Sequence, residues 1–316
     1  MSQTRRDFLL RTAQIGAVGS ILSRGYAQEP AKPASGASKP APAAAPLLFD
    51  ISLAEWSLHA ALQSGAIKNL DFPVLAAKDY DIRCVEYVNS FFKDSARDEK
   101  YLKELNLRCH DNGVTNHLIM CDGEGSLGAS KKEERAQAVE NHKRWVDAAK
   151  ALGCKTIRVN AAGDGTREEH QSQAADGLVQ LATYADPLGI NVIVENHGGV
   201  TSDGAWLAGV MKKAAHPRVG TLPDFGNFNL GDGKQYDRYQ GTAELMPYAK
   251  AVSAKSYDFD EQGNETTIDY EKMLKIVLAA KYHSWLGIEY EGSRLSEKDG
   301  ILATKALLLR LRAKLA

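Results

Sequence analysis

Residues 192–199 read VIVENHGG, and this stretch decides the fold. Its β-branched strand formers run directly into Glu195 and His197, and two glycines then end the run. Because alternate residues of a strand share a face, Ile193, Glu195 and His197 point the same way. We therefore expect a short buried strand that carries a carboxylate and an imidazole at the end of its inner face.

Two later stretches repeat this design. Residues 219–224 (VGTLPD) end in Asp224, and residues 285–291 (WLGIEYE) end in Glu289 and Glu291. Three short strands that each end in a carboxylate predict that the acids converge at one rim. Such a cluster is costly unless a cation or shared protons neutralise it.

Short apolar runs alternate with longer amphipathic segments from residue 47 onward. The expected strands are 48–53, 82–88, 114–120, 156–160, 192–199, 219–224, 251–255 and 285–291. The expected helices are 72–78, 95–112, 130–152, 166–188, 202–211, 242–246, 269–281 and 296–315. Eight such units in about 270 residues predict an α/β fold, a (β/α)8 barrel formed by a single domain. A doubly wound sheet is the alternative, but no glycine-rich phosphate loop follows the first strand.

Several of these helices carry start or stop signals. Ser130 with Glu133, and Thr166 with Glu169, have the spacing of capping boxes. Gly153 follows the third helical segment directly, as a C-terminal glycine does. These signals place the boundaries of the two longest central helices.

The first 27 residues resemble a twin-arginine export signal. Arg5 and Arg6 precede an apolar run at 13–22, and small residues at 25–27 suit cleavage. The run is too short to span a bilayer, so we expect no permanent membrane anchor. Residues 28–46, rich in Pro, Ala and Ser, predict a flexible linker before a barrel domain at 47–316. The expected location is the periplasm or the cell exterior.

The charge and the cysteine content of the chain limit the classes of partner and of metal site that we expect. The formal net charge is -1, and the first 27 residues carry +3, so the remaining chain carries -4. This acidic body argues against nucleic acid as the main partner. The four cysteines form no CxxC pair, so we expect mostly buried free thiols rather than a zinc knuckle.

Active sites of such barrels lie at the carboxyl-terminal ends of the strands. Glu195, Asp224 and Glu289 are the leading candidates there, because buried carboxylates are rare unless they are paired or metal-bound. Oxygen ligands of this kind suit Mg²⁺, Mn²⁺ or Zn²⁺, which would polarise a substrate carbonyl. The other candidates at this rim are Glu86, Arg158, Asn160, His197, Ser253, Lys255 and Glu291.

Some of these candidates also have a structural interpretation. Glu86 could form an ion pair with Arg158, and Lys255 could form a salt bridge with Glu289 on the adjacent strand. Trp56 and His59 could stack on a sugar or pack at the rim.

From residue 47 to the end, the chain resembles the xylose isomerase-like, or sugar phosphate isomerase/epimerase-like, TIM barrel superfamily. The segments 194–199 (VENHGG), 222–228 (LPDFGNF) and 287–292 (GIEYEG) carry the resemblance. It implies a divalent ion (Mn, Mg, Zn or Co) held by Glu195, Asp224 and Glu289. The two glutamates would then move a proton through an enediolate of the sugar.

The resemblance also implies a fourth ligand, a histidine on the seventh strand. Residues 252–256 (VSAKS) contain no histidine, and Ser253 stands in its place. Water or His197 could complete the shell, or Lys255 could supply the positive charge directly.

These features favour an exported, metal-assisted isomerase or epimerase of an unphosphorylated sugar or sugar derivative. A 3-keto-glycoside lyase or hydratase on the same barrel is one alternative, and a non-catalytic periplasmic sugar-binding barrel is another. A DNA-repair endonuclease of this fold is disfavoured, because it needs a histidine-rich zinc site and a basic groove. Assembly into a homo-oligomer is compatible with each of these interpretations.

Overall fold

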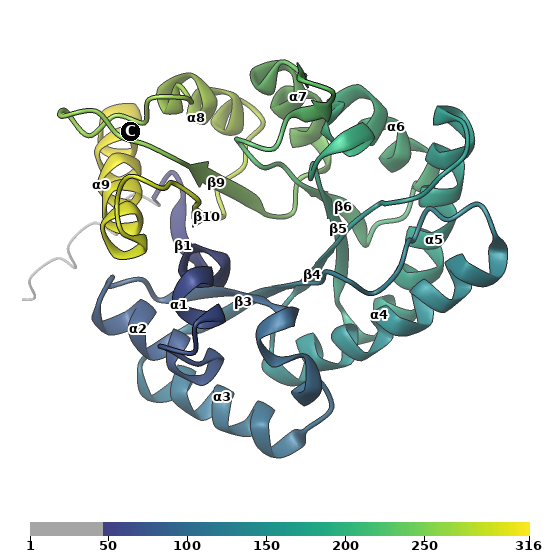
Figure 1. Cartoon of the computed structure of the whole chain (residues 1–316), viewed down its shortest axis with the longest axis horizontal. Coiled ribbons are helices and arrows are strands. Elements are labelled where there is room, and N and C mark those ends of the chain that lie inside the picture. The colour runs from purple at the N-terminus through teal and green to yellow at the C-terminus, as the bar shows by residue number, and fades with distance from the viewer. Residues whose placement is uncertain (1–46) are drawn as a thin grey trace, which may run out of the picture. The chain divides into compact units, whose positions relative to one another are not determined.

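Eight parallel strands curl into a ring in the computed structural model, which describes residues 47–316 (Figure 1). Around the ring the strands are β6 (Val219–Leu222), β5 (Asn191–Glu195), β4 (Thr156–Val159), β3 (Thr115–Met120), β2 (Cys84–Val88), β1 (Asp50–Ala54), β10 (Trp285–Tyr290) and β9 (Val252–Ser256). Parallel bridges from Thr221 to Ala249 and from Asp224 to Ser253 join the two edge strands, β6 and β9. The predicted (β/α)8 barrel is confirmed, and its closure places Asp224 beside β9.

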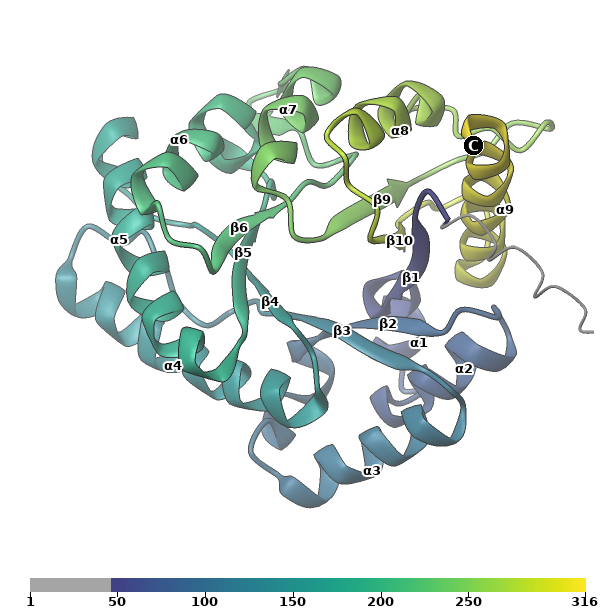
Figure 2. The ribbon, with the colours of Figure 1, turned by 180° about the vertical axis from the view of Figure 1, so that it is seen from behind.

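Helices surround the ring on its outer side (Figures 1 and 2). They are α1 (His59–Gln63), α2 (Phe72–Lys78), α3 (Glu99–Asp111), α4 (Lys132–Leu152), α5 (Arg167–Ala185), α6 (Gly204–Ala214), α7 (Arg238–Leu245), α8 (Tyr270–Ala279) and α9 (Glu297–Leu315). Within residues 47–316, none of the helices has the length and apolar character needed to cross a membrane. The predicted export signal (1–27) and linker (28–46) lie outside the described residues.

Apolar side chains fill the inside of the ring below the site. The inner cluster consists of Ala54, Val88, Leu118, Met120, Ile193, Leu222 and Ala251. Ile193 therefore faces inward, as the alternation in residues 192–199 predicts. A larger cluster packs the helices against the outside of the strands. The four cysteines are buried and free, as expected.

Three of the predicted helix starts differ clearly from the observed ones, and one of them is that of α7, which Asp237 caps and which begins at Arg238 rather than at residue 242. The Thr166–Glu169 capping box is present at the start of α5. The Ser130–Glu133 box is wrong, because α4 begins after Lys131 and the backbone N–H of Ser130 donates to Asp164 Oδ1 at 2.8 Å. Helix α3 starts later than residue 95, because Asp98 caps it through the N–H groups of the first turn.

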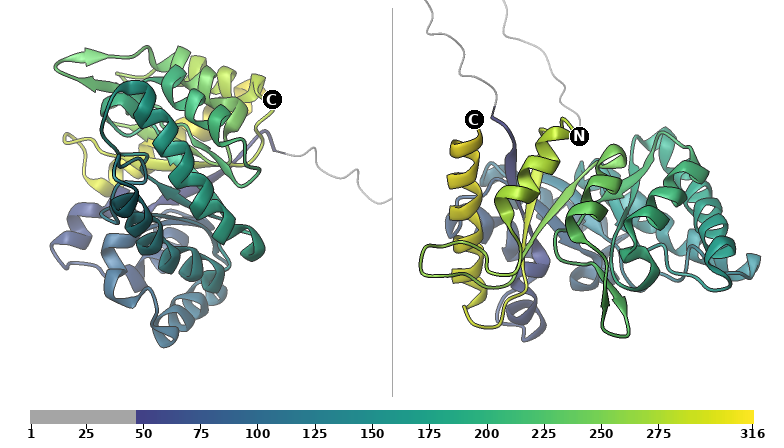
Figure 3. Two further views of the ribbon diagram at one scale, coloured as in Figure 1. Left: turned by 90° about the vertical axis from the view of Figure 1, so that its right-hand side faces the viewer. Right: turned by 90° about the horizontal axis from the view of Figure 1, so that it is seen from above.

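The segment after β6 contains a hairpin where the sequence predicts only a loop. Strands β7 (Asn229–Gly231) and β8 (Lys234–Gln235) pair antiparallel around Asp232 and Gly233, both of which have positive φ. In Figure 3 this hairpin projects from the barrel on the side opposite to the C-terminus. It therefore stands beside the strand ends that carry the candidate site.

Candidate active site

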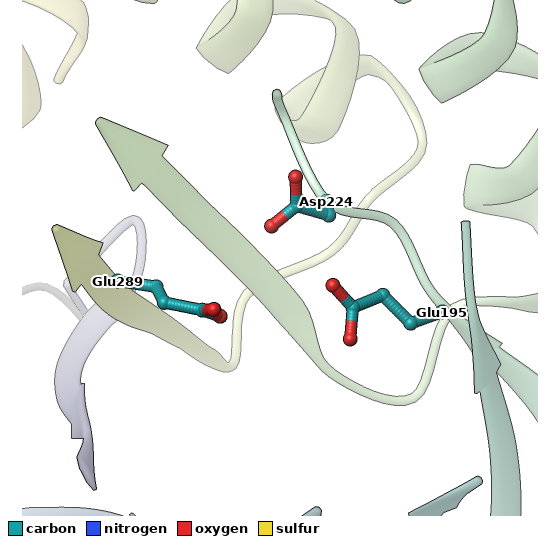
Figure 4. Close-up of side chains that lie close together, drawn as sticks. All are labelled: Glu195, Asp224 and Glu289. Atoms are coloured by element: carbon teal, nitrogen blue, oxygen red, sulfur yellow. The ribbon is translucent and has the colours of Figure 1, made fainter. Parts of the chain in front are cut away.

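Three carboxylates converge at the carboxyl-terminal end of the barrel. Glu195 ends β5, Asp224 follows β6 by two residues, and Glu289 lies on β10. One oxygen of each lies within 4.8 Å of the others, and all three side chains are buried. Figure 4 shows Glu195 and Glu289 approaching from opposite sides, with Asp224 between them. We call these three residues the acid cluster.

Asp224 is held by the turn that follows it. Its Oδ1 accepts hydrogen bonds from the backbone N–H groups of Gly226 (2.8 Å) and Asn227 (2.7 Å), and its Oδ2 accepts one from Ser253 Oγ at 2.6 Å. Asn196 fixes the backbone of Asp224, since its side chain bonds both the N–H and the C=O. The carboxylate is thus rigidly placed.

Glu195 has fewer partners. Its Oε1 accepts from Asn227 Nδ2 at 2.9 Å. Arg158 Nε lies 2.8 Å from Oε2, but the alignment of this ion pair leaves both atoms without a hydrogen bond. Arg158 also donates to Asp122 Oδ1 at 2.7 Å. One buried oxygen of Glu195 thus has an ion-pair partner but no aligned hydrogen-bond donor, and it can accept a further ligand.

Strand β9 supplies two side chains to the acid cluster. Ser253 Oγ lies 2.6 Å from Asp224 Oδ2 and 3.1 Å from Glu289 Oε2. Lys255 Nζ donates to Glu289 Oε1 at 2.7 Å and to Glu291 Oε2 at 2.8 Å. The predicted salt bridge between Lys255 and Glu289 is confirmed, and Ser253 stands between two acids of the cluster.

Burial and mutual repulsion shift the protonation of the acid cluster. Burial raises the pKa of Glu195 to about 7 against the opposing charge of Arg158, and the charge of Glu289 adds to the rise. Burial likewise raises the pKa of Asp224 to about 7. Burial opposes the charge of Lys255, but the surrounding carboxylates outweigh it and hold its pKa well above the usual value. The cluster therefore carries a permanent ammonium beside acids that bind protons near neutral pH.

A cavity of about 510 Å³ opens beside the acid cluster. Its lining includes Trp56, Val88, Met120, Asp122, Arg158, His197, Glu289 and Glu291. Trp56 donates its indole N–H to Glu291 Oε1 and stacks on His59, with ring centroids 4.9 Å apart. The lining thus combines charged groups with an apolar wall of Trp56, which follows β1, Val88 of β2 and Met120 of β3.

The remaining predicted site residues divide between this cavity and the barrel interior. Asn160 donates to Asp122 at 2.6 Å and lies 3.3 Å from His197 Nδ1. Burial and the charge of Arg158 lower the pKa of His197, which keeps its imidazole neutral at neutral pH. Glu86 lies inside the barrel, where Ser52 Oγ donates to it at 2.5 Å. The suggested pair between Glu86 and Arg158 is wrong, because Arg158 pairs with Glu195 and Asp122.

Three residues near the acid cluster were missed by the sequence argument. Asp122 holds Arg158 and Asn160, Asn227 donates to Glu195, and Asn196 positions Asp224. Each follows the end of a barrel strand, which is the signal that could have identified them. Their contacts join separate loops, so their partners are not readable from spacing.

The family comparison agrees with this geometry. Residues 74–312 match the family described as the xylose isomerase-like TIM barrel. The chain belongs to this family. The xylose isomerase-like chain thus has the barrel that the family description names. No protein of curated function matches it in sequence.

Solved structures share the fold at low sequence identity. A xylose isomerase-like TIM barrel protein from Mycobacterium smegmatis, in complex with magnesium, is 16% identical with a TM-score of 0.64, over 84% of this chain and 98% of that one. An L-ribulose 3-epimerase is 13% identical with a TM-score of 0.65, over 84% and 94%. A 3-keto-D-glucoside 4-epimerase from E. coli is 14% identical with a TM-score of 0.62, over 84% and 99%. At these identities the likeness establishes the fold alone.

The donor set of the acid cluster fits a divalent ion. Three carboxylate oxygens lie close enough to share one cation, and Glu195 Oε2 lacks a hydrogen-bond donor. Hard cations prefer oxygen ligands of this kind, and a positive centre would stabilise the charged forms of Glu195 and Asp224, whose pKa is raised first by burial and then by mutual repulsion. Ser253 Oγ offers a fourth, neutral oxygen.

Proposed function

We propose that this protein is a divalent-metal-assisted isomerase or epimerase that acts on an unphosphorylated sugar or sugar derivative. The convergence of Glu195, Asp224 and Glu289 at the barrel end carries this proposal. The similarity in fold to an L-ribulose 3-epimerase and to a 3-keto-D-glucoside 4-epimerase supports the reaction class. Mn, Mg, Zn and Co all suit the cluster, which does not select among them.

Glu195 and Glu289 are proposed to move the proton. They approach from opposite sides of the cluster, so each can face one side of a sugar carbon held between them (Figure 4). A bound divalent ion would polarise the carbonyl and hydroxyl oxygens next to that carbon and so acidify its C–H.

The other side chains are proposed to orient the substrate. Arg158 and Lys255 each already pair with two carboxylates, so the described part of the cavity offers no unpaired Lys or Arg for a phosphate group. His197 presents a neutral polar group to the cavity, and Trp56, which stacks with His59 and Phe91, adds an aromatic side chain. This lining favours a neutral polyhydroxy ligand.

Solvent exchange tests the reaction class. The purified protein, supplied with Mn²⁺, is incubated in D₂O with a panel of unphosphorylated ketoses and examined by NMR. We expect deuterium to enter the carbon next to the carbonyl of at least one ketose, and the Glu195→Gln variant to lose this exchange. Tight sugar binding without exchange would instead favour a sugar-binding barrel. Full exchange in excess chelator would contradict the proposed role of the metal.

A second candidate is elimination or hydration of a 3-keto-glycoside. It shares the same first step, proton removal next to a carbonyl, and the apolar wall at Trp56, Val88 and Met120 could face an aglycone. Incubation with a nitrophenyl 3-keto-glucoside distinguishes the two. Release of nitrophenol indicates elimination or hydrolysis, whereas an epimeric glycoside with its aglycone intact indicates epimerisation.

We also propose that residues 1–27 direct export through the twin-arginine route. The arginine pair, the apolar run and the small residues at 25–27 support this proposal. Fractionation of cells that express the full chain tests it. An Arg5→Lys, Arg6→Lys variant should remain in the cytoplasm, and equal export of that variant would contradict the route.

A further inference from the structure

Both oxygens of Glu289 already have polar neighbours. Oε1 accepts from Lys255 Nζ at 2.7 Å, and Oε2 lies 3.1 Å from Ser253 Oγ, whose single hydroxyl proton is shared with Asp224 Oδ2 at 2.6 Å. Lys255 is 1% exposed, so its ammonium is held inside the cluster rather than in solvent. A divalent ion that binds Glu289 must therefore displace or repel a cation that is part of the protein.

The same ammonium has a second partner outside the acid cluster. Lys255 Nζ donates to Glu291 Oε2 at 2.8 Å, and Glu291 Oε1 accepts the indole N–H of Trp56. Glu291 is partly exposed and lines the cavity with Trp56. A Lys255 side chain displaced from Glu289 can thus remain paired with Glu291 at the cavity wall.

We propose that Lys255 competes with the divalent ion for Glu289, and that metal entry shifts its ammonium onto Glu291 and changes the environment of Trp56. This inference rests on the proposed function only in that a divalent ion binds the acid cluster. Lys255 then makes metal binding weak and reversible, and it connects the metal to the wall of the substrate cavity. Because Ser253 offers only a neutral oxygen, it also lowers the affinity for the ion.

A charge-balanced double variant tests the competition. Lys255→Met with Glu291→Gln removes one positive and one negative charge, so the net charge of the site is unchanged while Glu289 loses its ammonium partner. Replacing a buried ion pair by neutral groups is often compatible with folding, and circular dichroism checks that it is here. Mn²⁺ binding is measured by calorimetry for the wild type and for the variant.

We expect the double variant to bind Mn²⁺ at least about tenfold more tightly, because like charges a few ångströms apart repel strongly in a buried site. Lys250→Met is the matched control. It removes a lysine two residues before β9, next to the closing bridge at Ala249, and should change the dissociation constant less than about twofold. Unchanged affinity in the double variant, with binding by the wild type, overturns this inference and leaves the proposed function intact. No binding by any variant overturns both.

Trp56 gives a second readout in the unaltered protein. Mg²⁺ titration should change the tryptophan fluorescence of the wild type, and Trp56→Phe should abolish that change while Mg²⁺ still binds by calorimetry. A signal that persists in Trp56→Phe would contradict the link from Lys255 to the cavity wall.

Discussion

Two acid-rich regions flank β9, and they hold their carboxylates in different ways. The first is the acid cluster, where Glu195 Oε2 lacks a hydrogen-bond donor. The second is the loop at residues 257–268, called here the acidic loop. There Glu265 accepts from several backbone N–H groups of its own loop, and Asp260 accepts from those of Gln262 and Asn264. Acids that bond only within their own loop stabilise structure, whereas Glu195 and Glu289 meet Asp224 from distant strands, where the three carboxylates can share a ligand.

The largest expected effect separates the two regions by activity. Glu195→Gln removes the proposed base and should lower the rate of C–H exchange by about 10²–10⁴-fold, with the fold retained. Glu265→Gln changes the same residue type in the acidic loop and should leave the rate per folded molecule unchanged. NMR exchange rates normalised to folded protein check both. Equal losses of exchange rate in the two variants would contradict the distinction between the acid cluster and the acidic loop.

The acids of the cluster were predictable because strand alternation and strand ends fix them. The sequence also offered the salt bridge between Lys255 and Glu289 as one interpretation. The register of β9 and β10 places these two residues opposite each other. The position of Glu86 inside the barrel did not follow from the sequence. Gly287 leaves room for its carboxyl group inside the barrel, since a Cβ there would lie 2.6 Å from both oxygens.

The contacts between loops at the site were also not predictable from the sequence. Asp122, Asn196 and Asn227 reach the site through turns whose geometry no periodic pattern encodes. The start of α4 was wrong for a similar reason, because Ser130 bonds Asp164 in a distant loop instead of capping its own helix. Local signals predict helices and strands, while contacts between loops depend on the closed barrel.

The second prediction concerns stability against pH in the metal-free protein. Folding raises the pKa of Glu195 from 4.5, and that of Asp224 from 3.8, to about 7, so the folded state binds more protons between these values. Stability should therefore fall as pH rises from about 4 to above 7, by up to roughly 3–4 kcal/mol per carboxyl. Thermal unfolding in chelator measures this, and Glu195→Gln with Asp224→Asn should flatten the slope. An equal slope in that variant would contradict the assignment.

The acidic loop should respond to pH with the opposite sign. Hydrogen bonds from backbone N–H groups lower the pKa of Asp258 and of Asp260. These groups contribute stability above their unfolded pKa and lose it as pH falls below about 4. Proteolysis of the loop at low pH, compared with neutral pH, reports this local loss.

The third prediction measures what the acidic loop contributes to folding. Glu265→Gln replaces a carboxylate that accepts from the backbone N–H of Tyr257 (3.1 Å), Thr267 (2.6 Å) and Ile268. Loss of these charge-assisted bonds should lower the free energy of unfolding by about 1–3 kcal/mol. Urea denaturation checks it, and a change near zero would mean that the loop is held by other contacts.

The smallest expected effect lies at the exposed tip of the same loop. Arg310 donates to the carbonyls of Gln262 and Gly263, each at 3.0 Å, and to Asn264 Oδ1 at 2.7 Å. These bonds are exposed, so Arg310→Ala should lower the free energy of unfolding by less than about 1 kcal/mol. Urea denaturation of this variant beside Glu265→Gln ranks the two contributions. A larger loss for Arg310→Ala would reverse the order expected from burial.

Diffraction from crystals grown with Mn²⁺ and measured on both sides of the manganese absorption edge tests the central claim most directly. An anomalous peak in bonding contact with an oxygen of each of Glu195, Asp224 and Glu289 is the predicted result. The absence of a peak between these three residues at saturating Mn²⁺, with their carboxylates still converged, would contradict the metal-assisted account.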